Sequence, residues 1–120
     1  MVTIVDDDES LRSALQGLMK EAGFTTLAFA SAEEFLSSGE QQRTSCLIAD
    51  IRMPGMSGLE LQSKLNADRA RFPIIFVTAQ GDEKMRMQAL RAGAVEFLSK
   101  PIDDGILLDS VRAALERDAL

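Results

Sequence analysis

Five short apolar runs, each followed by a segment with helical periodicity, constrain the fold of this chain more than any other feature. The apolar runs cover residues 2–5, 25–29, 46–49, 74–78 and 95–98. Runs of this length, rich in β-branched residues and bounded by turn residues, are typical of strands. Near-continuous apolar strands that alternate with helices predict a parallel sheet covered on both faces, because each crossover returns right-handed over the sheet. We therefore expect a doubly wound α/β fold.

Five helices are expected with these strands. The first begins after Asp8, places apolar residues at steps of three and four, and ends at Gly23. The last begins at Asp103 or Asp104 and repeats this spacing. The other three are predicted at residues 32–38, 58–67 and 83–92.

Length and charge limit the classes of function. A chain of 120 residues has the size of one domain, which we expect to cover residues 1–120. No apolar stretch approaches the roughly 20 residues of a membrane span, and the acidic residues 6–9 do not fit a secretory signal. We therefore expect a cytoplasmic protein without membrane association. A net charge of -6 also disfavours direct binding of nucleic acid by this chain.

The side chains available for chemistry are few. The chain has no histidine, which excludes histidine as general base, metal ligand or phosphoryl donor. The single cysteine, Cys46, lies in an apolar run and is expected to be a small buried residue without a disulfide. Any chemistry must therefore depend on carboxylates.

Polar residues follow four of the predicted strands where each strand ends. These residues are Asp6 and Asp7 after the first strand, Asp50 after the third, Thr78 at the end of the fourth and Lys100 after the fifth. In doubly wound sheets ligands bind beyond the carboxyl ends of the strands where the strand order reverses. For the flavodoxin-like order 2-1-3-4-5 that point lies between the first and third strands. All five side chains should therefore converge on one edge of the sheet.

This set of residues matches the requirements of phosphoryl transfer. Carboxylates about 4 Å apart repel by roughly 4 kcal/mol per pair at an effective dielectric constant near 20, so a divalent cation is expected among them. Ligands that are all oxygens favour Mg²⁺ or Mn²⁺ over zinc. Asp50 can then attack a phosphoryl group as the nucleophile, while the cation and Lys100 neutralise its oxygens and Thr78 donates a hydrogen bond.

Each of these residues also has an ordinary structural interpretation. An aspartate pair between a strand and a helix often caps the helix, and Asp8 is assigned wholly to that role. Asp50 can start a turn, Thr78 can be a common strand residue, and Lys100 can be a solvated surface lysine. Their placement at one sheet edge favours the functional interpretation.

Four motifs carry a resemblance to a known family. They are Val5-Asp6-Asp7-Asp8, residues 48–58, Val77-Thr78-Ala79 and Lys100-Pro101. In these motifs the chain resembles, along essentially its whole length, the response-regulator receiver domains of bacterial two-component systems. Residues 29–35, 53–61, 81–82 and 92–97 are similar to FixJ-type receivers, which control transcription through a separate C-terminal DNA-binding domain. No such output domain is found here, so the chain is interpreted as a receiver fragment or a stand-alone regulator.

The resemblance implies a role for each site residue. Asp50 would be the phosphoacceptor, and the metal would be held by Asp7, Asp50 and the backbone carbonyl of Arg52, with Asp6 acting through metal-bound water. Thr78 and Phe97 would form the switch pair of the family. The phosphoryl donor would be a sensor histidine kinase, and the peptide bond between Lys100 and Pro101 would be cis. The chain would catalyse only its own phosphorylation and dephosphorylation.

The helix predicted at residues 83–92 has two apolar stripes. The first contains Met85, Ala89 and Ala92 and is expected to pack on the sheet. The second, Met87 with Leu90, is then expected to face solvent and, with Arg91 and Glu96, to form a phosphorylation-dependent homodimer face. The alternative is that Met87 and Leu90 lie at the edge of the core.

Three other functions fit the sequence less well. Phosphatases with an aspartate nucleophile need a second aspartate two residues later, where this chain has Arg52. A flavin-binding protein is disfavoured because the chain lacks Tyr, Trp and a glycine-rich phosphate loop. A pseudo-receiver, an interaction module that is never phosphorylated, remains the alternative, although the retained site residues argue against it.

Overall fold

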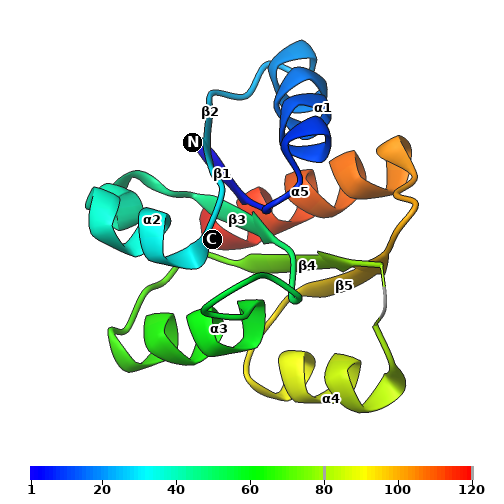
Figure 1. The fold of residues 1–120 in the computed structure, drawn as a ribbon. Coiled ribbons are helices and arrows are strands. Elements are labelled where there is room, and N and C mark those ends of the chain that lie inside the picture. Colours follow the sequence, from blue (N-terminus) through cyan, green and yellow to red (C-terminus); the bar gives the residue numbers. More distant parts are fainter. Residues whose placement is uncertain (80, 120) are drawn as a thin grey trace.

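The structure, a computed structural model, describes residues 1–79 and 81–119. Five parallel strands form one sheet in the order β2-β1-β3-β4-β5, which confirms the predicted strand order (Figure 1). The strands are β1 (Val2–Val5), β2 (Thr26–Phe29), β3 (Cys46–Ala49), β4 (Ile74–Thr78) and β5 (Glu96–Ser99). The second strand begins one residue later than predicted, and the fifth begins and ends one residue later.

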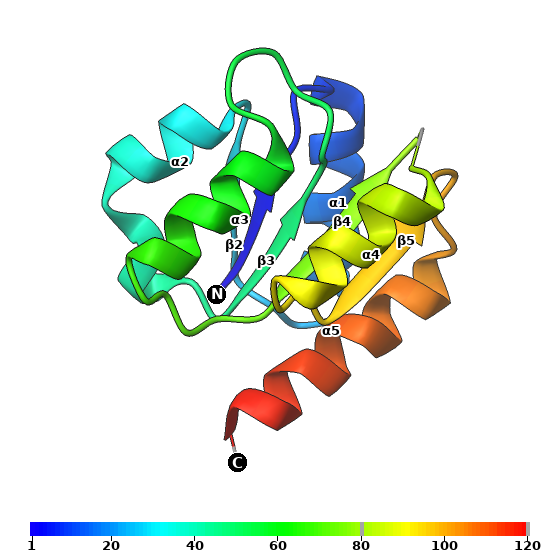
Figure 2. The ribbon, with the colours of Figure 1, turned by 90° about the horizontal axis from the view of Figure 1, so that it is seen from below.

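Helices cover both faces of the sheet. The described helices are α1 (Glu9–Glu21), α2 (Ala32–Ser38), α3 (Gly58–Ala67), α4 (Glu83–Arg91) and α5 (Asp104–Ala119). Helices α2, α3 and α4 lie on one face, and α1 and α5 lie on the other (Figure 2). A short 3-10 helix, η1 (Glu40–Arg43), follows α2 and was not predicted. None of the described helices combines the length and apolar character needed to cross a membrane.

Two apolar cores lie on opposite sides of the sheet. On one side Phe76 of β4 packs in a cluster with Phe35 of α2 and Leu61 of α3. On the other side Ile48 of β3 belongs to the cluster that contains Met19 of α1. Successive strand residues alternate between these cores, as the geometry of a strand requires. Cys46 belongs to the second core and is buried, as predicted.

The ends of α1 follow the predicted signals. Asp8 is its N-cap, and the Asp8 carboxylate accepts a hydrogen bond from the backbone N–H of Leu11 at 3.2 Å. Gly23 lies just beyond the helix with a φ of 93°, a conformation that favours glycine, so the chain can turn back toward β2.

The strand register brings the predicted site residues to one edge. Val5 of β1 pairs with Ala49 of β3, so Asp6 and Asp50 leave adjacent strands at the same level. Thr78 at the end of β4 lies opposite Ser99 of β5. The sheet edge predicted to carry the site is therefore formed by the loops after β1, β3, β4 and β5.

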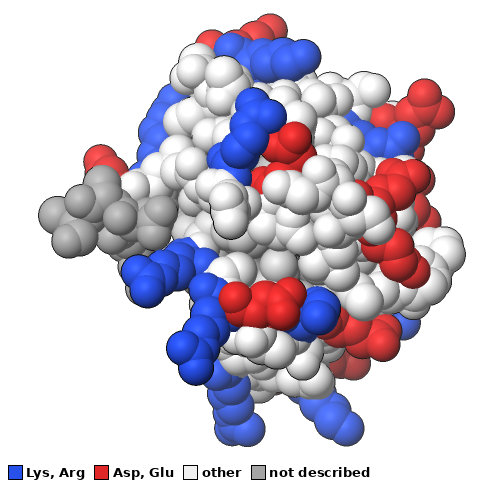
Figure 3. Space-filling model, turned by 90° about the vertical axis from the view of Figure 1, so that its left-hand side faces the viewer, with Lys and Arg blue, Asp and Glu red and all other residues white. Residues whose placement is uncertain are grey.

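Charge is unevenly distributed over the surface. Figure 3 shows one face of the molecule, on which Lys and Arg side chains gather mainly in the lower part with acidic side chains between them. The chain as a whole has 13 basic and 19 acidic residues. Acidic side chains therefore lie among the basic side chains on this face.

Candidate functional site

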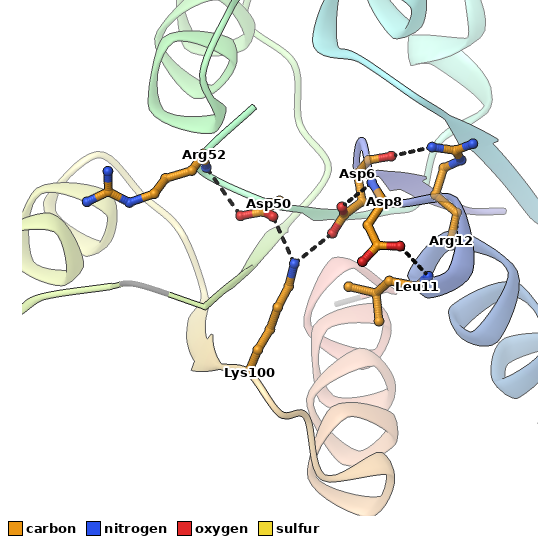
Figure 4. Close-up of polar contacts among 7 residues, drawn as sticks. All are labelled: Asp6, Asp8, Leu11, Arg12, Asp50, Arg52 and Lys100. Carbon is orange, nitrogen blue, oxygen red and sulfur yellow. Dashed lines mark hydrogen bonds and ion pairs between the residues drawn. The ribbon is translucent and has the colours of Figure 1, made fainter. Parts of the chain in front are cut away.

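Asp6 is the most enclosed carboxylate of the site. It follows β1, and only 2% of its surface is exposed. One carboxylate oxygen, Oδ1, accepts the backbone N–H of Asp8 at 2.9 Å, and Oδ2 accepts the Lys100 ammonium at 3.1 Å (Figure 4). Burial raises the pKa of Asp6 above its usual value, because these hydrogen bonds offset only part of the cost of removing the carboxylate from water.

Asp50 lies opposite Asp6 after β3. It is 7% exposed, and its backbone N–H donates to the carbonyl of Val5 at 3.0 Å, which fixes it beside β1. Its Oδ1 accepts the backbone N–H of Arg52 at 3.2 Å, and its Oδ2 accepts the Lys100 ammonium at 2.8 Å. The side chain is therefore oriented from both sides.

Lys100 joins the two carboxylates. Its ammonium lies between Asp6 and Asp50 and forms an ion pair with each (Figure 4). Burial alone would lower the pKa of Lys100, but its hydrogen bonds to Asp50 and Asp6 and the charges of both outweigh that effect and raise the pKa. The peptide bond to Pro101 is cis, as predicted.

Three carboxylates at this edge are close enough to share a cation. Oxygen atoms of Asp6, Asp7 and Asp50 all lie within 4.8 Å of one another. Asp7 is exposed, so the cluster opens to solvent on its side, while Asp6 and Asp50 are buried. A set of oxygen ligands with access for water suits Mg²⁺ or Mn²⁺. The residues therefore fit a hard divalent cation.

The Thr78 hydroxyl is buried without a partner. The residue is 1% exposed, and its Oγ1 has no hydrogen-bond partner among the described residues. Buried hydroxyl groups are nearly always paired, so this one is available to a group that binds at the strand ends. A Cβ added to Gly81 would collide with both the Thr78 methyl group and the Phe97 ring, so these two predicted switch residues lie near each other.

Helix α4 only partly follows the prediction for its two stripes. Ala89 is buried as expected, and Met87 is exposed at 38%. Leu90 is half-buried and packs against the core, which agrees with the alternative stated for it, and the prediction was wrong for Ala92, which is exposed. Ala92 follows the last helical residue, so the helical spacing no longer applies to it.

Arg91 at the end of α4 and Glu96 at the start of β5 were predicted to lie at the surface. Both are exposed. Arg91 also lines a shallow surface pocket together with Met87 and Lys84. The exposed residues of the predicted dimer face are therefore Met87, Arg91 and Glu96.

Two residues that support the site were not identified from the sequence. Gly58 lies against the backbone of Asp50, and a Cβ there would collide with the Asp50 carbonyl oxygen. Glu33 of α2 accepts the backbone N–H of Met56, in the loop that follows Asp50, at 3.1 Å. Gly58 belongs to a quoted motif and could have been found there, whereas an acidic residue in the first turn of a helix gives no sign of such a contact.

Comparison with known proteins gives one consistent family. The model of the response regulator receiver domain matches residues 2–112. Nodulation protein W of Bradyrhizobium diazoefficiens is 48% identical over 98% of this chain and 52% of its own length. The transcriptional regulatory protein FixJ of Azorhizobium caulinodans is 40% identical over 98% of this chain and 56% of its own length. The chain thus spans about half the length of these relatives.

Solved structures agree with this result. The response regulator StyR superimposes with a TM-score of 0.91 at 45% identity, covering 98% of this chain and 60% of that one. The crystal structure of FixJ-N gives a TM-score of 0.85 at 37% identity, covering 96% of this chain and 92% of that one.

Proposed function

This chain belongs to the response-regulator receiver domains, the signalling modules of two-component systems, and we propose that it accepts a phosphoryl group on Asp50 in a reaction that requires Mg²⁺. Receiver domains of this family accept the group from sensor histidine kinases. The observation that carries the proposal is the position of Lys100, whose ammonium contacts both Asp50 and Asp6 where three carboxylates converge.

The chemistry follows from the positions of these groups. An Asp50 carboxylate oxygen forms a bond to phosphorus as the bond from phosphorus to the donor imidazole nitrogen breaks, and the electron pair stays on that nitrogen. Lys100 neutralises charge on the phosphoryl oxygens, and the unpaired Thr78 hydroxyl donates a hydrogen bond to one of them. No general base is needed, because the nucleophile carries no proton to remove.

The metal would be held by Asp7, Asp50 and the backbone carbonyl of Arg52, with Asp6 acting through metal-bound water. Mg²⁺, or Mn²⁺ in its place, would supply positive charge to the phosphoryl oxygens. The convergence of the three aspartates supports this assignment. The Arg52 side chain itself extends away from Asp50 (Figure 4).

A groove beside Lys100 supports a protein donor. It runs between α1 and the loop after β5 and is lined by Leu11, Leu15 and Ile102 among others. A kinase that presents phosphohistidine to Asp50 must contact the surface around the site, and an apolar groove next to Lys100 offers buried area for that contact. Because such kinases draw phosphate from ATP, this encounter belongs to the cytoplasm.

The output is proposed to be a change of surface on α4 and β5. Phosphorylation would draw the Thr78 hydroxyl toward the phosphoryl group, and Phe97 would move with it because both side chains lie beside Gly81. The face affected is that of Met87, Arg91 and Glu96, which would form a homodimer about a two-fold axis. Transcription would then be controlled through a separate DNA-binding domain, because the net charge of -6 disfavours direct binding of DNA by residues 1–120.

Intact-mass measurement tests the proposal. We expect wild type incubated with Mg²⁺ and acetyl phosphate to gain the mass of one phosphoryl group, and the gain to fall by about tenfold or more when EDTA removes the metal. Asp50→Ala should gain none under either condition. Equal phosphorylation of wild type with and without Mg²⁺ would contradict the role of the metal, and unmodified wild type would favour the pseudo-receiver.

A further inference from the structure

The loop between β3 and α3 is closed at its base. It carries Asp50 and Arg52 and ends at Gly58, whose backbone N–H donates to the carbonyl of Ile51 at 2.8 Å. Gly58 also lies so close to the Asp50 carbonyl that any larger residue would force the backbone at the two ends of the loop apart. The two ends of the loop are therefore fixed to each other.

The tip of the same loop is held by another element. Glu33 of α2 accepts the backbone N–H of Met56 at 3.1 Å through its Oε2. That carboxylate lies directly over Gly55, where an added Cβ would collide with Oε2. Gly55 has a φ of 77°, so a side chain at this position would be strained as well as crowded. Glu33 is thus the hydrogen-bond acceptor, and the lack of a side chain on Gly55 leaves room for its carboxylate.

We propose that Glu33 is a positioning residue for the phosphoacceptor site. Between the base of the loop and Met56 lie residues 52–55, and this segment begins with Arg52, whose carbonyl is proposed above as a metal ligand. Mg²⁺ requires near-octahedral geometry at about 2.0–2.1 Å, so a ligand on a freely moving loop binds it weakly. By holding the loop tip, Glu33 reduces that freedom. This inference rests on the proposed function.

Helix capping does not account for the position of Glu33. The neighbouring Glu34 serves the start of α2, since its Oε2 accepts the backbone N–H of Ala30 at 3.0 Å and its own N–H donates to Ser31. Both glutamates lie in the first turn and interact alike with the helix dipole. Of these two glutamates, Glu33 alone has a hydrogen bond to the loop among the described residues, so Glu34→Ala is a matched control for lost charge and for a weakened helix start.

The experiment compares Glu33→Ala, Glu33→Gln and Glu34→Ala with wild type in the 120-residue chain. Mg²⁺ affinity is measured by calorimetric titration, and protection of the Met56 amide is measured by hydrogen exchange without metal. Glu33→Ala should weaken Mg²⁺ binding by about threefold to tenfold and speed exchange at Met56 by a similar factor, because one hydrogen bond is lost. Glu33→Gln keeps a carbonyl acceptor and should stay within about twofold of wild type. Glu34→Ala should leave both quantities unchanged.

Each contrary result has a distinct meaning. Unchanged Met56 exchange and Mg²⁺ affinity in Glu33→Ala would overturn the role of Glu33 while leaving the proposed function intact. A Glu33→Gln variant as weak as Glu33→Ala would also overturn it, since long-range charge rather than the hydrogen bond would then be responsible. Failure of wild type itself to bind Mg²⁺ would overturn the proposed function and this role together.

Discussion

At the scale of single residues, the site contains two buried polar groups that lower the stability of the fold while nothing is bound to them. Asp6 is a buried carboxylate with a raised pKa, and Thr78 carries a buried hydroxyl without a partner among the described residues. Both features reduce stability unless another group binds. Residues of this kind are expected at functional sites rather than in a core that has only to pack.

The first prediction concerns Thr78. Replacing it with Val keeps the shape and removes the unpaired hydroxyl, so the free energy of unfolding in urea should stay the same or rise by about 1 kcal/mol. Thr3→Val is the matched control, because Thr3 is equally buried but shares a 2.7 Å hydrogen bond with Thr44, and it should lose about 1 kcal/mol. In Thr78→Val the NMR signals of Phe97 should no longer respond to a phosphoryl mimic.

A Thr78→Val variant that lost as much stability as Thr3→Val would show that the hydroxyl of Thr78 has a partner. A normal response of Phe97 in that variant would remove Thr78 from the switch.

The second prediction concerns Asp6 and pH. Burial raises the pKa of Asp6 in the folded state, so Asp6 adds to the stability of the fold while its carboxyl group is protonated. This contribution is complete below the unfolded pKa of 3.8 and is lost as the pH rises through the folded pKa. At pH 7 the ionised carboxylate is therefore destabilising when no metal is bound. Because Lys100 keeps Asp50 as an ion-pair partner, Asp6→Asn should raise the free energy of unfolding by about 1 kcal/mol at pH 7 in metal-free solution, and the gain should shrink toward acidic pH.

Urea unfolding at several pH values measures this, with Asp7→Asn as the control that removes a charge from an exposed position of the same cluster. The control should change stability less. A less stable Asp6→Asn protein at pH 7 would contradict the argument.

At the scale of elements, the strands and the site edge were predictable but the faces of α4 were not. Apolar runs define the strands directly, and parallel topology then places the residues that follow them at one edge. The side chain of Leu90 packs against the core although its position in the sequence predicted a solvent-facing stripe. Whether such a residue reaches the core depends on how the helix packs on the sheet. Side-chain amides of Gln62 and Asn66 on α3 also bind the carbonyls of Ala89 and Ala92 at 2.9 and 2.8 Å. Such contacts between helices leave no periodic signal in the sequence.

The third prediction is for the exposed part of α4. Wild type should dimerise on addition of a phosphoryl mimic, and Met87→Asp should weaken this association by about tenfold or more, because a charge would be buried in the interface. Sedimentation velocity measures both. Ser13→Asp adds the same charge to the exposed surface of α1, in the opposite helical layer, and should dimerise like wild type. Equal dimerisation of Met87→Asp and wild type would exclude this face.

At the scale of the whole molecule, the site exists only when the sheet is complete. Lys100 is 94 residues from Asp6 and 50 residues from Asp50 along the chain, yet its ammonium contacts both. The strand order places β1 beside β3 at the centre, and β5 brings Lys100 from the edge. The same order also explains why four motifs far apart in the sequence belong to one site, since each motif lies at the carboxyl end of a strand. The loop contact of Glu33 depends on the packing of α2 and had no such signal.

The most direct test of the account is to identify the residue that carries the phosphoryl group. Sodium borohydride reduces an aspartyl phosphate to homoserine and releases phosphate, so it marks the acceptor permanently. After incubation with Mg²⁺ and acetyl phosphate, reduction and peptide mapping by mass spectrometry should find homoserine at position 50 and at no other aspartate. Homoserine at Asp6 or Asp7, or a labelled Asp50→Asn protein, would contradict the assignment of Asp50 as the phosphoacceptor.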